Sequence, residues 1–288
     1  MLRISCLGFA LALASCTALS SPEAALRTAS AGYGAPATVA LPLIRMNVAV
    51  REGAKTRSLF LSGQAVAEWP DKLRLKLTKA DIHLVTLVVN GHAAALHFPR
   101  TSKALDVELN RPVLGGETAD PLAAALEMTL ILVQGPFPLH PLGAYTLEGE
   151  VKGVYTYAAP IQGGTLRLAV DGRTGAVRSR TCRFAGREEW AIGVAFDQYE
   201  TMGDHRFPRK FTLTACKGTD PLPAVTVEIY LAQVNFNRPA PAAAFRAAWP
   251  EGTVKLAELP AKLEELFGTI EETPGSADGP GEALKPNL

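Results

Sequence analysis

The sequence predicts a mainly β protein of the α+β class, in which one curved antiparallel sheet of about ten or eleven strands encloses one buried helix. Two observations lead to this fold class. Apolar and polar residues alternate along most of the chain, most regularly in residues 188–236, as they do in strands with one buried face. A single stretch, between residues 120 and 136, is instead apolar nearly all round.

Residues 188–236 predict three consecutive antiparallel strands. They cover residues 189–199, 210–216 and 225–231. Large apolar side chains take every second position in the first two strands, which places them on one face of the sheet. These residues are Trp190, Ile192, Val194, Phe196, Phe211 and Leu213. The polar connection between these two strands is predicted to end at Pro208, which cannot donate a ladder hydrogen bond.

The same alternation predicts further strands on the amino-terminal side of this region. They cover residues 44–50, 58–62, 72–77, 82–89 and 92–98. The last two form a hairpin, because Asn90-Gly91 suits the positive φ angles of a tight type I′ turn. Three more strands and two short helices are also predicted. The strands lie at residues 147–157, 165–170 and 176–184, and the helices at residues 239–249 and 256–267.

The buried helix is predicted to span residues 122–134. Asp120-Pro121 supplies an N-cap and a proline suited to the first turn, and Gly135-Pro136 ends the helix. Its apolar residues, among them Leu126, Leu130 and Val133, leave almost no polar face. At about 14 residues, or ~21 Å, it is short for a membrane span. It is therefore expected to lie inside the curved sheet as a lid.

The amino terminus has the composition of a secretory signal. Residues 1–15 contain one cation, Arg3, and then an apolar run. Leu13-Ala14-Ser15-Cys16 resembles a bacterial lipobox, which implies cleavage before Cys16 and a diacylglycerol group on its sulfur. Thr17 stands where an aspartate would indicate inner-membrane retention, so the resemblance favours the outer membrane with the folded part in the periplasm. The alternative is an ordinary signal peptide cleaved near Ala18 or Ser21.

These features divide the chain into four parts. Residues 1–15 are the signal, and residues 16–38 are an acylated tether with a short helix after Pro22. Residues 39–270 form the folded domain. Residues 271–288 are rich in Gly, Pro and charge without an apolar period, and they are expected to be disordered.

Charge and motifs exclude several classes of function. Removing residues 1–15 leaves 28 basic residues, the 29 of the whole chain minus Arg3, against 28 acidic ones. This neutral balance argues against nucleic acid as a partner. The five histidines lack zinc spacing, and neither His-Glu-x-x-His nor Gly-x-Ser-x-Gly occurs. The sequence therefore predicts no metal, no cofactor and no enzymatic activity.

Cys182 and Cys216 are the two cysteines that remain if Cys16 is acylated. An oxidising periplasm permits a disulfide between them. In a simple meander they lie two strands apart, at ~9–10 Å, whereas bridged Cα atoms lie within ~7 Å. Both states stay open from the sequence.

Several short motifs resemble the LolA/LolB-like superfamily of lipoprotein carriers and receptors. They are an Asp-Gly-x-Thr-Gly turn at residues 171–175, a strand ending in Tyr199, the connection from Gly203 to Pro208, and a strand that ends before Asn235. The carboxyl-terminal part adds Phe245, Trp249-Pro250-Glu251-Gly252 and Val254-Lys255-Leu256. The resemblance covers about residues 40–260. It implies an open half-barrel with a helical lid over a cavity for acyl chains.

The resemblance also implies a function. The protein is expected to bind acyl chains of lipids or lipoproteins, with a cavity lined by the apolar strand residues above and by Leu126, Leu130 and Val133. Arg178 and Arg180 share a face in a regular strand and are candidates for contact with lipid headgroups. Two alternatives remain: the helix completes a packed core, or the same half-barrel binds a periplasmic protein as a sensor or scaffold.

Overall fold

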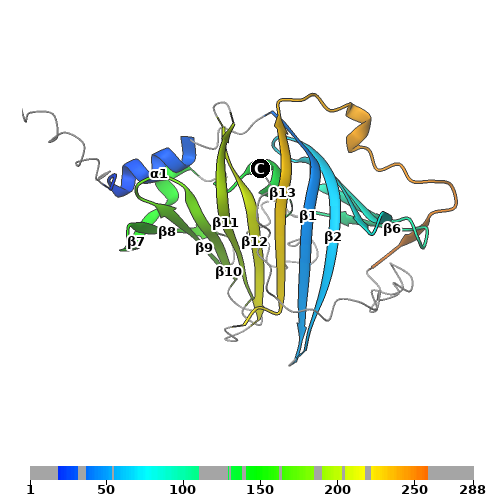
Figure 1. Ribbon diagram of the computed structural model, residues 1–288, viewed down its shortest axis with the longest axis horizontal. Coiled ribbons are helices and arrows are strands. Elements are labelled where there is room, and N and C mark those ends of the chain that lie inside the picture. Colours follow the sequence, from blue (N-terminus) through cyan, green and yellow to red (C-terminus); the bar gives the residue numbers. More distant parts are fainter. Residues whose placement is uncertain are drawn as a thin grey trace, which may run out of the picture.

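The structure is a computed structural model, and the residues it describes form one open sheet of fourteen strands (Figure 1). The description covers residues 19–31, 37–53, 55–109, 129, 131–137, 141–161, 164–184, 190–202, 205–217 and 222–258. The sheet order is β14-β6-β5-β4-β3-β2-β1-β13-β12-β11-β10-β9-β8-β7. Its two edges, β14 and β7, do not pair with each other, so the sheet is a half-barrel rather than a closed barrel.

Two antiparallel meanders make up this sheet. The first contains β1 Thr38–Glu52, β2 Lys55–Glu68, β3 Lys72–Lys79, β4 Ile82–Asn90, β5 Ala93–Phe98 and β6 Lys103–Glu108. The second contains β7 Thr146–Val151, β8 Val154–Ile161, β9 Gly164–Asp171, β10 Val177–Phe184, β11 Trp190–Met202, β12 His205–Lys217 and β13 Val225–Phe236. Antiparallel pairing of β1 with β13 joins the meanders, and the short β14 Val254–Leu256 adds to β6 in parallel.

The predicted fold class is confirmed: the protein is mainly β, with a single curved antiparallel sheet in which only β14 runs parallel to its neighbour. The strand count is higher than predicted for three reasons. β6 and β14 were not predicted, and the segment expected as one strand at residues 147–157 is a hairpin of β7 and β8. The turn between β7 and β8 consists of Lys152 and Gly153, whose φ angles of 52° and 78° are those that a type I′ turn requires.

The hairpin of β4 and β5 is confirmed with a different turn. Asn90 pairs with Ala93, so the loop consists of Gly91 and His92. Gly91 has a φ of 64°, whereas His92 does not have a positive φ. That pattern is typical of a type II′ turn, which needs glycine only at its first central position.

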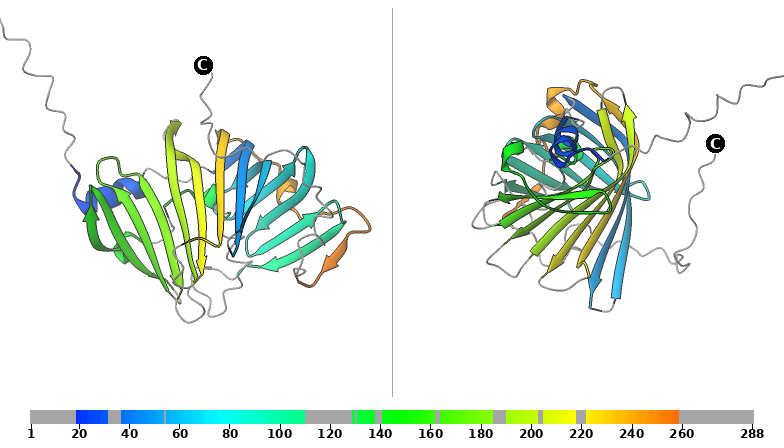
Figure 2. Two further views of the ribbon diagram at one scale, coloured as in Figure 1. Left: turned by 60° about the horizontal axis from the view of Figure 1, so that its bottom comes forward. Right: turned by 90° about the vertical axis from the view of Figure 1, so that its left-hand side faces the viewer.

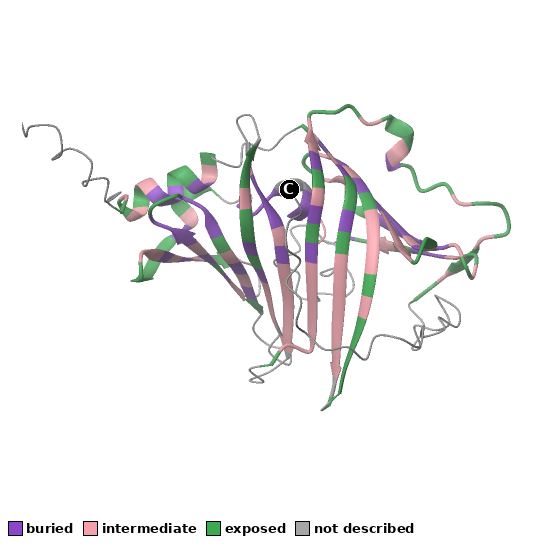
Figure 3. Ribbon diagram, viewed as in Figure 1, coloured by how far each residue is buried: buried purple, intermediate pink, exposed green. Residues whose placement is uncertain are grey.

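The sheet is strongly curved (Figure 2), and its concave face carries the hydrophobic core. Buried and less buried residues alternate along the strands. The buried side chains on this face include Leu73, Val89, Leu105, Leu168 and Phe211. Figure 3 shows that the central strands are buried at one end and only partly buried towards the other. The core therefore fills one part of the concave face.

The short helix α3 Ile131–Gln134 lies in this core and ends where the sequence predicts. Gly135 has a φ of 73°, and its N–H donates to the carbonyl of Ile131 at 3.0 Å. Ile131 and Leu132 are both almost fully buried. The amino-terminal part of the predicted helix lies outside the described residues.

Helix α1 Pro22–Ala31 confirms the short helix predicted after Pro22, but it is not part of a free tether. Its Ala25, Leu26 and Ala29 are buried in the core. The hydroxyls of Tyr155 and Tyr157 donate to the carbonyls of Ser20 and Pro22 at 2.9 and 2.6 Å. The folded part of the chain thus begins before residue 39, because the apolar side of α1 covers the concave face at β8 and β9.

The segment after β13 crosses the opposite, convex face of β3–β6. A 3₁₀ turn, η2 Ala242–Phe245, takes the place of the helix predicted at residues 239–249. The guanidinium of Arg74 donates to the carbonyl of Ala244 at 3.1 Å, and His97 stacks on Trp249. Leu256 ends β14, so the helix predicted from residue 256 does not begin there, and its remainder after residue 258 lies outside the described residues.

Candidate functional site

The concave face carries the predicted apolar strand residues side by side. Val194 pairs with Leu213 and Phe196 with Phe211 across β11 and β12. The rings of Phe196 and Phe211 meet edge to face, with centroids 5.8 Å apart. Val194, Phe196 and Phe211 are buried, whereas Ile192 and Leu213 are partly buried against the core.

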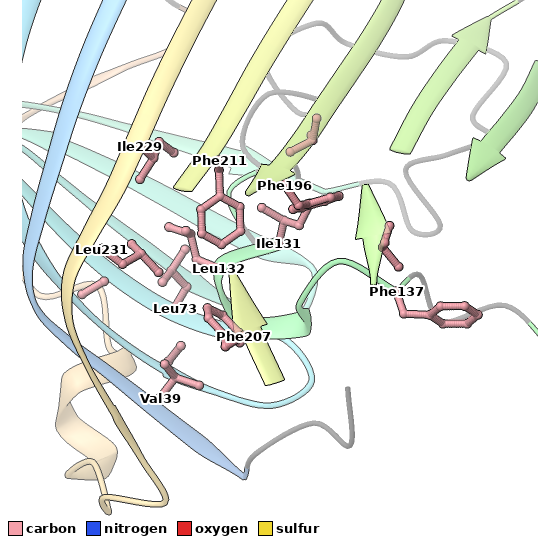
Figure 4. Packing of buried hydrophobic residues seen from close by; sticks show 14 of the residues in the cluster. Val39, Leu73, Ile131, Leu132, Phe137, Phe196, Phe207, Phe211, Ile229 and Leu231 are labelled. Atoms are coloured by element: carbon pink, nitrogen blue, oxygen red, sulfur yellow. The ribbon is translucent and has the colours of Figure 1, made fainter. Parts of the chain in front are cut away.

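The helical part of the predicted site is described only at its end. Ile131 and Leu132 of α3 pack in the same cluster as Phe196, Phe211 and Leu73 (Figure 4). Val133 belongs to α3, but the direction of its side chain lies outside the description, as does that of Trp190 in β11. Leu126 and Leu130 lie outside the described residues altogether.

Strand pairing extends the predicted residues into two apolar rows across five strands. Residues directly opposite each other on neighbouring strands share one face of the sheet. The first row is Leu61, Met46, Ile229, Phe211 and Phe196, and the second is Leu59, Val48, Val227, Leu213 and Val194. The second row is only partly buried except at Val194. The rows span β2 to β11, or four strand spacings of about 4.8 Å.

Arg180 stands next to the second row on β10. It pairs with Val194 of β11 and with Leu168 of β9, both buried on the concave face. Its side chain is 7% exposed. The prediction that Arg178 and Arg180 share a face is wrong, because a β-bulge between Val177 and Ser179 shifts the alternation of β10.

Arg178 instead stabilises a turn outside the apolar rows. Its guanidinium donates to Asp171 at 2.7 Å, and its side chain is 47% exposed. The carboxylate of Asp171 also accepts from the N–H and hydroxyl of Thr174, each at 2.9 Å. Although burial alone would raise the pKa of Asp171, the hydrogen bonds from Arg178 and Thr174 and the charge of Arg178 lower it to about 2. The Asp-Gly-x-Thr-Gly motif is therefore a structural turn.

A second buried arginine, Arg209, was missed by the sequence analysis. Its guanidinium donates to Glu200 at 2.7 Å and to the carbonyls of Leu231 and Ala232. Pro208 lies inside β12 rather than before it, and pairing of β12 with β13 extends only to Lys210. The side chain of Arg209 thus bonds β13 carbonyls beyond the end of the ladder. In the sequence, the signal for this arrangement was Pro208, which stands in an otherwise strand-like segment.

The cysteines do not form a disulfide; both are free. Cys182 pairs with Ile192 of β11, and Cys216 pairs with Ala191. Because neighbouring residues of a strand point to opposite faces, the two thiols lie on opposite faces of the sheet. Cys182 is buried on the concave face, where burial raises the pKa of its thiol and the hydrogen bond and charge of Arg180 partly oppose that rise.

Within the described ranges, no group of three or more His, Cys, Asp and Glu side chains gathers in a geometry suited to a metal ion. None of the helices seen in those same ranges is long and apolar enough to cross a bilayer. A pocket of about 840 Å³ lies between β4–β6 and the segment that follows η2, lined by Val88, Ala95, Asp106, Phe245 and Arg246 among others.

The comparisons with known proteins support the fold. No protein-family model matches the chain, and no curated protein matches it. A LolA superfamily protein from Nitrosomonas europaea superimposes with a TM-score of 0.50 at 9% identity, covering 80% of this chain and 99% of that one. A DUF1329 family protein from Desulfovibrio piger gives 0.50 at 11% identity, covering 79% and 98%. The chain therefore shares the LolA-like half-barrel fold with these proteins at low sequence identity.

Proposed function

We propose that this protein binds acyl chains of lipids or lipoproteins without covalent bonds on the concave face of its half-barrel, and so acts in their transport or localisation. The supporting observation is the second apolar row, which continues the packed core as a strip of half-buried side chains. Water covers part of this strip, and hydrocarbon would remove it. Each buried CH₂ of a ligand contributes about 0.8 kcal/mol.

Helix α3 covers part of the concave face with apolar side chains that an acyl chain can replace. Ile131 and Leu132 fill the concave face beside Phe196 and Phe211 with side chains chemically similar to an acyl chain (Figure 4). An acyl chain that displaces them makes the same kind of dispersion contacts, so the exchange costs little apolar burial. Binding then requires movement of α3.

The cellular setting belongs to the same proposal. A lipid group on Cys16, after removal of residues 1–15, anchors the protein in the outer membrane with the half-barrel on its periplasmic face. The neutral charge balance argues against nucleic acid as a partner. The proposed partners are membrane lipid, lipoproteins and a periplasmic protein that exchanges cargo. Neither a cofactor nor catalysis is needed, because the proposed work is transfer of an amphiphile between two binding sites.

The test compares two neighbouring residues of β13. Val227 faces the concave side in the second row, and Thr226 faces the convex side between Thr214 and Ala49. Residues 16–288 are produced in the cytoplasm, where Cys16 is not acylated, and mixed with palmitate vesicles. Native mass spectrometry is recorded before and after organic extraction.

We expect extractable adducts of lipid mass in the wild type and in Thr226→Glu, and their loss in Val227→Glu. Circular dichroism establishes that both variants keep the sheet. A wild type that remains free of added lipid would overturn the proposal. α3 would then complete a permanent core, and a stoichiometric protein partner would favour the sensor or scaffold function.

A further inference from the structure

Arg180 places a positive charge inside an otherwise apolar part of the concave face. Its neighbours across the sheet are Leu168, which is fully buried, and Val194. Two positions along the same strand lies the buried Cys182. An arginine in these surroundings loses most of its hydration, which is unfavourable unless its donors find acceptors.

Two of those donors find no acceptor in the described part of the chain. Nε and Nη1 of Arg180 are inaccessible to water and have no hydrogen-bond partner among the described residues. No carboxylate in the described ranges forms an ion pair with it. Its interactions are with the hydroxyl of Tyr145, whose pKa is raised by burial and lowered by the charge of Arg180, and with the thiol of Cys182. Neither group carries a compensating charge at neutral pH.

Arg209 shows what a satisfied arginine looks like in the same sheet. It is also buried, at 9% exposure, and it bonds one carboxylate and two backbone carbonyls. The two arginines are thus similarly enclosed, yet Arg180 has no carboxylate or carbonyl acceptor for Nε and Nη1 among the described residues. Because guanidinium is always protonated and donates strong hydrogen bonds to carboxylate or phosphate oxygens, the unused donor Nη1 suits an external oxyanion.

The described residues 131–137 and 141–145 include side chains near both the apolar rows and Arg180. Ile131 and Leu132 lie on the core at the rows, and Phe137 and Tyr145 follow them, with ring centroids 5.8 Å apart. The positive charge of Arg180 acts on the hydroxyl of Tyr145 and lowers its pKa. A movement that frees the apolar rows therefore also opens the way to Arg180, so one amphiphile can reach both.

We infer that Arg180 is the headgroup site of the half-barrel, and that the ligand is an acyl chain ending in a small oxyanion, such as the carboxylate of a fatty acid. The chain lies along the second row, from Val194 towards Leu59, and the oxyanion accepts a hydrogen bond from Nη1 of Arg180. This inference rests on the proposed function and narrows it from hydrocarbon in general to anionic single-chain amphiphiles. A carboxylate or a phosphate monoester supplies the same chemistry.

The experiment measures binding of three ligands with one chain length by the mature chain, residues 16–288, after removal of lipid. Palmitate carries a carboxylate, hexadecyl phosphate a phosphate, and hexadecanol no charge. Variants are Arg180→Met, which keeps the length without charge, Arg180→Lys, which keeps the charge without the fork, and Arg183→Gln, which removes an exposed charge from the same strand.

We expect the wild type and Arg183→Gln to bind one or both anions about 10- to 100-fold more tightly than hexadecanol, as charge-assisted hydrogen bonds imply. Arg180→Met should bind all three alike, and Arg180→Lys should lie between. Unliganded Arg180→Met should melt no lower than the wild type, since it loses a buried charge without acceptors. Palmitate and hexadecyl phosphate then identify which oxyanion is preferred.

The outcomes separate the two levels of the proposal. If hexadecanol binds as tightly as the anions to the wild type, or if Arg180→Met keeps the preference for anions, the headgroup site is wrong while acyl-chain binding stands. If none of the three ligands binds, the proposed function fails with it. A large loss of stability in unliganded Arg180→Met would show that Arg180 is a structural residue, and would also overturn the inference.

Discussion

The imidazole of His97 stacks on the indole of Trp249, with ring centroids 4.8 Å apart and 14° between the ring planes. His97 lies on the convex face of β5 and is buried by the segment that crosses that face after η2. Nζ of Lys72 lies over the ring of Phe245, a residue of the same segment, at 5.9 Å from the ring centroid. These contacts attach residues 237–258 to the first meander.

The stability of this attachment should depend on pH. Burial lowers the pKa of His97 below 6.5, so the folded protein binds fewer protons than the unfolded chain between that lower value and 6.5. The free energy of unfolding should therefore be constant above about pH 7.5 and fall as the pH drops through 6.5. Urea unfolding between pH 8 and pH 5 measures this slope.

Two variants assign the slope to the stack. His97→Gln should flatten it in part, because His83, whose pKa is also lowered by burial and by Lys76, still contributes. Trp249→Ala should uncover His97 and return its pKa towards 6.5, as followed by NMR titration. An unchanged slope in both variants would mean that other groups control stability in this range.

The turn at Asp171 should contribute to stability in the opposite part of the pH scale. The pKa of Asp171 is about 2 in the folded protein against 3.8 ordinarily, so its contribution of about 2.5 kcal/mol is present above about pH 4 and is lost as the pH falls towards 2. Asp171→Asn should lower the free energy of unfolding at pH 7 by a similar amount. Chemical denaturation at pH 7 and pH 3 gives both values.

Asp106→Asn is the matched control for this prediction. Asp106 also pairs with a cation, Lys255 at 2.6 Å, but both side chains are more than half exposed. Exposed pairs contribute about 0–1 kcal/mol. Equal effects of the two substitutions would contradict the structural importance assigned to the Asp171 turn.

Arg209 should be required for the fold. Arg209→Met leaves the carbonyls of Leu231 and Ala232 without their donor, and a buried acceptor left unpaired costs about 1–3 kcal/mol, whereas the half-exposed Glu200 is hydrated instead. Thermal unfolding compared with Arg180→Met tests this directly. Arg209, which bonds a carboxylate and two carbonyls, should be costly to remove, whereas Arg180, whose Nε and Nη1 are unpartnered, should not. The reverse order would show that the two roles are exchanged.

The sequence by itself determined the features that have the strongest local signals. Alternation along residues 188–236 predicted β11, β12 and β13 and the side chains that share their apolar face. Gly135 predicted the end of α3, because only glycine readily takes its positive φ of 73°. The same local reasoning explains the limits: Lys152-Gly153 is a weaker turn signal than Asn90-Gly91, so the hairpin of β7 and β8 was taken for one strand.

Only the tertiary structure decided which strands meet and which face each side chain takes at an irregular position. Val48 and Val227 are 179 positions apart in the sequence, and their pairing creates the apolar rows through contact of β1 with β13. A bulge at Arg178 turns Arg180 inward, and the registers of β10 and β12 on β11 place Cys182 and Cys216 on opposite faces. The physical reason is that periodicity is a property of one strand, whereas register, bulges and burial depend on its neighbours.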